Sequence, residues 1–265
     1  MSLMSLSGGQ GKTTTTLFLA KLLSSNYSVC VVDADSLHNT STFLDCEVSV
    51  DQVSLLEVMM GRDSSGRPVA IRDGIYQVER DRDLYLIPSD NALDAVQRFL
   101  EDSGIGALSL RLKLNEIANQ FQFCLIDSPP QRSPLSKAIL GASDFVLIPL
   151  ESSAKGINAL VRTLEFIDDA KLHSQGIIQT KLLGITPFRE KWVGRNLTNE
   201  SKQCVDALRE AYPDKLFPSI RESEQLKQAL SKGVLQSEVD PDLLHPFRVI
   251  ADRLVAQLNN HARPL

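Results

Sequence analysis

The strongest constraint on this chain is a glycine-rich loop close to its start. The loop follows a short apolar run, Leu3 to Leu6, and precedes an amphipathic segment that predicts a helix from Thr14 to about Ser24. Strand, glycine loop, lysine, hydroxyl and helix is the order of a phosphate-binding loop. Glycines lack a Cβ, so successive backbone N–H groups can converge on one anion, and the helix behind them adds its positive end.

Two side chains at the end of the loop carry the nucleotide prediction. Lys12 is expected to reach the β- and γ-phosphates of ATP, and the Thr13 hydroxyl is expected to ligate Mg²⁺. The alternative is a glycine-rich turn before an ordinary helix, and the strand that precedes the loop favours the phosphate interpretation. The residues predicted to hold ATP are Ser7, Gly8, Gly9, Gln10, Gly11, Lys12, Thr13 and Thr14.

The loop departs from the general P-loop pattern, G-x-x-x-x-G-K-[ST], because Leu6 stands where the outer glycine would be. It resembles instead the deviant pattern K-G-G-x-G-K-[ST] of the ParA/MinD family of ATPases. In that family the first lysine of the pattern reaches across a dimer to the phosphates of the partner. Ser7 occupies this position here, and its short neutral side chain supplies no charge.

Length and composition fit one globular α/β unit. The 265 residues show neither an internal repeat nor a low-complexity linker, so we expect a single domain over 1–265. Strand-like and helix-like segments alternate, which predicts a mostly parallel twisted sheet with helices on both faces, as in P-loop NTPases. Four scattered cysteines without a C-x-x-C spacing fit a reducing cytosol, and no apolar run approaches the roughly 18 residues of a membrane span.

Acidic residues follow two buried strands of the predicted sheet. Val29 to Val32 ends at Asp33 and Asp35, and Phe123 to Ile126 ends at Asp127 and a Pro-Pro pair. Carboxylates at strand ends of a parallel sheet face the crevice where ligands bind, although they could simply end a strand and cap a helix. We predict Asp33 and Asp127, with Thr13, as the magnesium ligands. The family resemblance implies that Asp35 orients the attacking water.

Later segments supply candidates for the rest of the site. The resemblance places the loop after the predicted strand Leu182–Pro187 near the adenine, which makes Pro187 and Phe188 candidates for base contacts. Lys155 follows another strand, Phe145–Ile148, and we hypothesise that it replaces the missing lysine across a dimer. The alternative is an ordinary surface lysine at a helix start.

The stretch from Lys181 to Lys232 carries ten Lys or Arg against seven Asp or Glu, whereas the whole chain has a net charge of -5. This mild excess predicts phosphate contacts with duplex DNA, or else only a solvated surface. The DNA-binding candidates are Arg189, Lys191, Arg195, Arg221, Lys227 and Lys232.

The resemblance covers nearly the whole chain and implies a function. Its members bind ATP and Mg²⁺, form a nucleotide-sandwich homodimer, attach to a surface and are released when an adaptor protein stimulates hydrolysis. The small size and Ser7 are most similar to the carboxysome-positioning branch, which implies nonspecific nucleoid DNA as the surface and a cytoplasmic, nucleoid-associated protein.

Two alternatives remain open from the sequence. One is a membrane-cycling ATPase like MinD, whose last helix is a basic amphipathic anchor. The last predicted helix here, from about His245, lacks a dense lysine face, and we expect it to pack on the sheet without a membrane partner. Its start is ambiguous, because Asp240-Pro241 has the features of a cap and first helical position, whereas Pro246 is also tolerated only in a first turn. We place the regular helix from about His245 onward. The other alternative is a metabolic enzyme or small-molecule kinase on the same scaffold.

Overall fold

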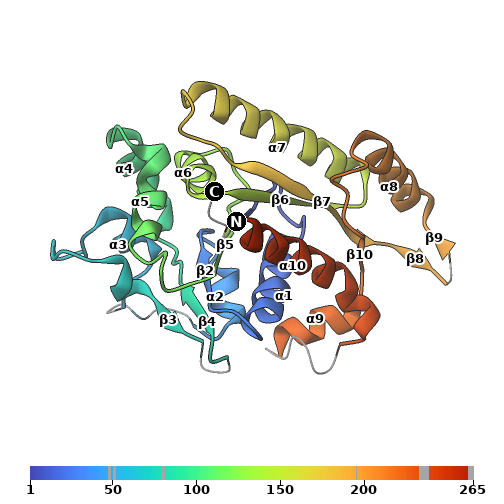
Figure 1. The fold of residues 1–265 in the computed structure, drawn as a ribbon, viewed down its shortest axis with the longest axis horizontal. Coiled ribbons are helices and arrows are strands. Elements are labelled where there is room, and N and C mark those ends of the chain that lie inside the picture. The colour runs from blue at the N-terminus through green and yellow to red at the C-terminus, as the bar shows by residue number, and fades with distance from the viewer. Residues whose placement is uncertain (47–48, 50–51, 79–80, 195, 233–238, 262–265) are drawn as a thin grey trace.

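The computed structural model describes residues 1–46, 49, 52–78, 81–194, 196–232 and 239–261. Within this part of the chain the strands form one eight-stranded sheet in the order β10-β7-β6-β1-β5-β2-β4-β3 (Figure 1). All neighbouring strands are parallel except β3, which runs antiparallel to β4. The bounds of the strands are β1 Ser2–Leu3, β2 Val29–Asp33, β3 Tyr76–Gln77, β4 Leu84–Ile87, β5 Phe123–Asp127, β6 Phe145–Glu151, β7 Lys181–Glu190 and β10 Ile220–Arg221.

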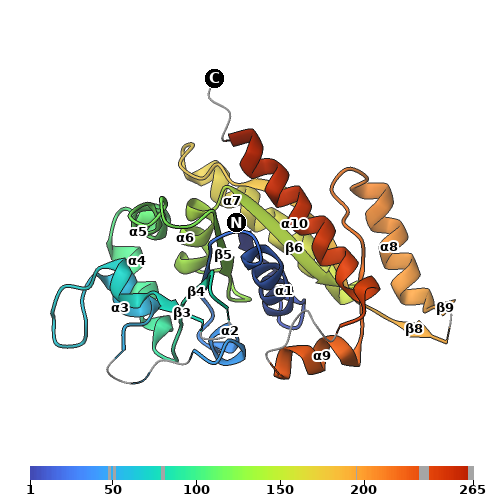
Figure 2. The ribbon, with the colours of Figure 1, turned by 60° about the horizontal axis from the view of Figure 1, so that its bottom comes forward.

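Helices cover both faces of this sheet (Figure 2). On one face lie α1 Lys12–Ser24, α9 Glu224–Ser231 and α10 Pro241–His261. On the other lie α3 Leu55–Met60, α4 Val96–Asp102, α5 Ser109–Asn115, α6 Pro134–Ala142, α7 Ala154–His173 and α8 Asn199–Ala211. Short segments complete the fold: α2 Asn39–Phe43 and the 3-10 turns Ile71–Gly74, Leu93–Ala95 and Gly106–Leu108.

The strands are buried on both faces, as their apolar sequences predict. In β2, Val29 and Val31 pack into the cluster beneath α1 and α10, whereas Cys30 and Val32 pack into the cluster on the opposite face. Side chains alternate between the faces of a strand, so a strand covered on both sides has to be apolar at every position. The predicted α/β fold, a mostly parallel sheet between two helical layers, is confirmed.

The prediction for the last helix is wrong at its start. Helix α10 begins at Pro241, not at His245, and Pro246 lies inside it. Asp240 caps the helix, because its side chain accepts a hydrogen bond from the amide of Asp242 at 2.9 Å. A proline in the second turn removes one helical hydrogen bond. The packing that follows offsets this loss, because Phe247 stacks on Phe18 of α1 with ring centroids 4.6 Å apart.

Several elements were not predicted from the sequence. These are α2, α6, strand β3 and a hairpin of β8 Trp192–Val193 with β9 Asn196–Leu197. The sequence did contain a start signal for α6. The Ser133 side chain caps the helix by accepting a hydrogen bond from the amide of Ser136, and Pro134 occupies the first turn. No helix of the described residues is both long and apolar enough to cross a membrane.

Candidate nucleotide site

The glycine loop lies between β1 and α1, at the carboxyl edge of the sheet. Gly9 and Gly11 have φ angles of 76° and 91°, in the left-handed region that side chains rarely adopt. Gly11 is also covered by the ring of Phe188, whose atoms lie 2.5 to 2.6 Å from the point where a Cβ would stand. Glycine at position 11 is therefore required both by the backbone and by the packing.

Lys12 folds back over this loop. Its ammonium donates hydrogen bonds to the carbonyl oxygens of Ser5 and Ser7, both at 3.3 Å, and the residue is buried. Burial lowers the pKa of Lys12, and the carboxylates of Asp127 and Asp35 oppose this shift. The lysine is therefore kept beside the loop by carbonyl oxygens that a phosphate could replace as its partner.

The two strand-end carboxylates lie side by side, as predicted. Asp33 and Asp127 are register partners on β2 and β5, and both are buried. Thr13 at the start of α1 donates its hydroxyl hydrogen to Asp127 Oδ2 at 2.7 Å. Burial, and then the charge of Asp127, raise the pKa of Asp33 to about 7. The three residues predicted as magnesium ligands therefore meet at one point of the sheet edge.

Two hydroxyl residues of α2 complete this cluster and were not predicted. Thr40 donates to Asp127 Oδ2 at 2.7 Å, and Ser41 donates to Asp33 Oδ2 from its hydroxyl at 2.8 Å and its amide at 2.9 Å. A polar pair shortly after a strand-end acid was the only signal in the sequence. It was missed because the helix that turns both hydroxyls toward the acids was not predicted.

The cluster fits a magnesium ion bound together with a nucleotide. Within the part of the chain that the structure describes, Asp127 Oδ1 is a buried oxygen without a hydrogen-bond partner, which makes it available to a cation. Across the described residues, no group of three or more His, Cys, Asp or Glu forms a metal site on its own. Mg²⁺ keeps several waters and shares phosphate oxygens, so one hydroxyl and two carboxylates beside a phosphate loop are a suitable ligand set.

Comparisons with known proteins agree with this geometry. A protein-family model described as an AAA domain matches residues 1–177. The maintenance of carboxysome distribution protein A of Synechococcus elongatus is 44% identical over 253 residues, which cover 94% of this chain and 96% of that protein. The protein of the same name from Gloeothece citriformis is 42% identical and covers 94% of each.

Solved structures give the same relationship. The apo structure of a Cyanothece McdA superposes with a TM-score of 0.87 at 42% identity and covers 96% of this chain and 98% of that one. The ATP complex of a Cyanothece McdA variant has a TM-score of 0.88 at 41% identity, with 96% and 95% covered. The chain belongs to the ParA/MinD family of ATPases.

Two further candidates for ParA-type chemistry follow strands β2 and β6. Asp35, half-buried, accepts a hydrogen bond from the amide of Leu37 at 3.1 Å. Lys155 is exposed in the first turn of α7. The buried Gln10 side chain joins that region to the loop, because its Oε1 accepts from the amide of Glu151 at 2.8 Å. The end of β6, three residues before α7 begins, is thereby bonded to the phosphate loop.

The candidates for base contacts are both buried. Pro187 pairs in register with Leu150 of β6, and the Phe188 ring packs on the loop at Gly11 as described above. Phe188 is only 7% exposed. A contact of either residue with adenine stays a prediction.

The predicted DNA-binding residues differ in the groups that they contact. Lys191 approaches Glu151 at 4.0 Å, and Lys227 pairs with Glu224 at 2.7 Å and Glu222 at 3.7 Å. Arg221 lies over the Trp192 ring, 5.0 Å from its centroid. Lys232 follows α9, and Arg195 lies outside the described residues. Arg189 is set apart from the others, because its side chain turns back toward the phosphate loop.

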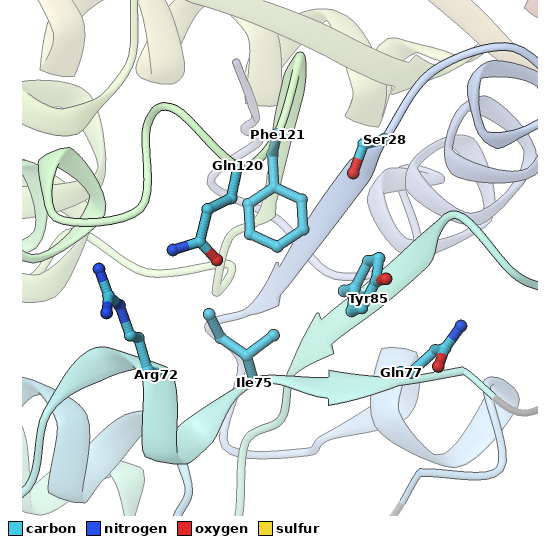
Figure 3. A pocket seen from close by; sticks show the side chains of 7 residues that line it. All are labelled: Ser28, Arg72, Ile75, Gln77, Tyr85, Gln120 and Phe121. Atoms are coloured by element: carbon cyan, nitrogen blue, oxygen red, sulfur yellow. The ribbon is translucent and has the colours of Figure 1, made fainter.

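A separate pocket lies away from this site. It has a volume of about 380 Å³ and is lined by residues at the amino ends of β2 and β5 together with β3 and β4, including Ser28, Tyr85 and Phe121 (Figure 3). Ligands of open α/β sheets bind at the carboxyl edge, so this pocket is not a candidate for the nucleotide.

Proposed function

We propose that this ParA-type ATPase binds ATP with Mg²⁺, dimerises around the nucleotide and binds nonspecific DNA. In this proposal it positions a cargo, the carboxysome, and an adaptor protein stimulates its hydrolysis of ATP. One observation carries the proposal. A phosphate loop beside a cluster of one hydroxyl and two carboxylates is found in a chain that is 44% identical over nearly its full length to a carboxysome distribution protein.

Each part of the nucleotide site has a role in this proposal. The loop amides and Lys12 bind the phosphates, while Thr13, Asp33 and Asp127 hold the magnesium. Bound Mg²⁺ would neutralise charge on the phosphates. Asp35 lies at the same edge with a carboxylate that is not buried in the cluster, and it orients the attacking water.

Ser7 leaves dimerisation without its usual cation. We propose that Lys155 supplies it to the nucleotide of the partner subunit. The support is its position. It is exposed, lies in the first turn of α7, and follows strand β6, whose last residue, Glu151, is bonded to Gln10. Lys12 folds over the loop of its own subunit, and Lys155 would need to do the same to reach that nucleotide.

The proposed DNA surface consists of Lys191, Arg221, Lys227 and Lys232, near the carboxyl ends of β7 and β10. Ion pairs on an exposed surface contribute little to stability, so Lys191 and Lys227 can exchange their carboxylate partners for DNA phosphates. Two subunits double the surface, so DNA binding should follow ATP-dependent dimerisation. Nucleoid association in the cytoplasm would follow from this binding.

A gel shift with nonspecific duplex DNA tests the proposal. We expect a shift with ATP and none with ADP or without nucleotide. The shift should be retained or strengthened in Asp35→Ala, and it should weaken steeply from low to moderate salt because phosphate contacts release counterions. Arg221→Ala should weaken it, whereas Arg209→Ala, which removes an arginine paired with Asp206 on α8, should not.

Failure would be informative. The absence of a shift with every nucleotide would exclude the DNA surface. Flotation of the protein with liposomes in ATP would then point to membrane cycling, and turnover stimulated by a small-molecule acceptor without dimerisation would point to a metabolic enzyme.

A further inference from the structure

The cation that the loop lacks at position 7 has a second possible source within the same subunit. We propose that Arg189 is a phosphate-binding residue of the nucleotide site, placed over the loop by the end of β7. The inference rests on the ATP binding proposed above, but not on the DNA surface or on dimerisation.

The side chain already lies against the loop. Arg189 Nη1 is 3.8 Å from the point where a Cβ would stand on Gly9. The preceding residue, Phe188, covers Gly11 in the same way, and the Arg189 guanidinium lies over the Phe188 ring, 5.6 Å from its centroid. Two consecutive residues of β7 therefore face two glycines of the phosphate loop.

The backbone is bent to allow this. Consecutive side chains of a strand normally point to opposite sides. Arg189 instead has a φ of 54°, in the left-handed region that is unfavourable for a side chain of its kind. This conformation turns its side chain to the side of Phe188. Such outliers persist where the surrounding structure imposes them, and they concentrate at functional sites.

Arg189 also differs from its basic neighbours in its ion pairing within the described part of the chain. Lys191 and Lys227 each have carboxylate partners. Among the residues that the structure describes, Arg189 forms no ion pair with an acid. It is close enough to Lys227 to oppose the rise in the pKa of Lys227 that Glu224 causes. An exposed, unpaired guanidinium held beside Gly9 of the phosphate loop is suited to an anion.

Its chemistry fits a phosphate. The guanidinium is a planar fork of donors that matches two phosphate oxygens at once, and it keeps its charge at every physiological pH. Placed beside Gly9, it would add a second cation, besides Lys12, to the phosphate site. It would restore, from within the subunit, part of the positive charge that Ser7 does not provide.

Nucleotide binding to the full chain tests this directly. The dissociation constant of Mg²⁺ with a non-hydrolysable ATP analogue is measured by calorimetry, without DNA, for the wild type, Arg189→Gly, Arg189→Lys and Lys181→Ala. Lys181 is the matched control, because it is an exposed cation at the opposite end of the same strand. We expect Arg189→Gly to weaken binding about tenfold or more, Arg189→Lys to weaken it less, and Lys181→Ala to stay within about twofold.

The glycine variant separates binding from folding. Glycine tolerates a φ of 54°, so Arg189→Gly should melt at or above the wild-type temperature while it binds nucleotide more weakly. An unchanged dissociation constant in Arg189→Gly would overturn the inference. Equal weakening in Lys181→Ala would also overturn it, since the effect would then be one of general charge. If the wild type bound no nucleotide, the proposed function and this inference would fall together.

Discussion

At the scale of single residues, the site places two buried carboxyl groups close together, which is electrostatically unfavourable when both are charged. Asp33 and Asp127 are buried beside each other, and the pKa of Asp33 is raised to about 7 by burial and by Asp127. A cation bound between them would remove this penalty. The hydroxyl donors Thr40 and Ser41 hold both carboxylates in place until one arrives.

This arrangement predicts a pH dependence of stability. From pH 3.8 to about 7 the folded state retains a proton on Asp33 that the unfolded chain has released, so its stabilising contribution is lost as the pH rises through 7. The contribution is up to about 4 kcal/mol. Urea denaturation of the nucleotide-free protein from pH 5 to 8 should show this fall, and Asp33→Asn should reduce it. The exposed Asp102→Asn serves as the control, and an equal slope in Asp33→Asn would contradict the assignment.

A second residue-scale prediction concerns Gly11. Gly11→Ala should destabilise the protein by about 1–3 kcal/mol, because the added methyl meets the Phe188 ring and the left-handed backbone. In a Phe188→Ala background the clash is gone and only the backbone strain remains, so the cost should be smaller by about 1 kcal/mol. A double-mutant cycle of unfolding free energies measures this difference. The same cost in both backgrounds would mean that the ring does not constrain Gly11.

At this scale the sequence predicted what lies in contiguous motifs. The glycine loop, Lys12 and the acids at two strand ends were found because each motif contains its own local signal. Thr40 was missed because its role depends on α2, a short helix with weak sequence features. The position of Arg189 could not be predicted, since it depends on one left-handed residue at the end of a strand distant in sequence from the loop.

At the scale of elements, the phosphate loop depends on α1, and α1 depends on α10. Phe18 and Phe247 stack at the centre of this contact, and both are fully buried. The sequence predicted both helices from their apolar periodicity, but it misplaced the start of α10. The rule that excludes proline from a helix interior was overridden there by the cap at Asp240 and by this packing.

Phe247→Ala should therefore lower the free energy of unfolding by about 3–5 kcal/mol, through lost burial and the cavity left against Phe18. Asp252→Ala, an exposed change on the same helix, should stay within about 0.5 kcal/mol of the wild type. Urea denaturation with and without a nucleotide provides the measurement. A loss below about 1 kcal/mol in Phe247→Ala would show that other contacts hold α10 on the sheet.

At the scale of the whole molecule, the carboxyl edge of the sheet brings every proposed function together. The nucleotide cluster lies at β1, β2 and β5, the start of α7 follows β6, and the basic residues follow β7 and β10. A parallel sheet directs all its strand ends to one edge, so nucleotide binding could change both the proposed dimer and the proposed DNA surface without long-range coupling through the core. This convergence was predictable from the fold class, whereas the pairing of the basic residues with nearby acids was not.

A dimerisation assay tests whether Lys155, at this edge, joins two subunits around the nucleotide. Lys155→Ala should leave the fold and nucleotide binding by the monomer intact, because Lys155 is exposed, but it should abolish the ATP-dependent dimer. Lys171→Ala removes a lysine from the other end of α7 and should dimerise normally. Light scattering coupled to size exclusion, in ATP and in ADP, measures both variants in an Asp35→Ala background that slows hydrolysis. If Lys155→Ala still dimerises with ATP, the cation that compensates for Ser7 acts within one subunit, and Arg189 becomes the residue to test for it.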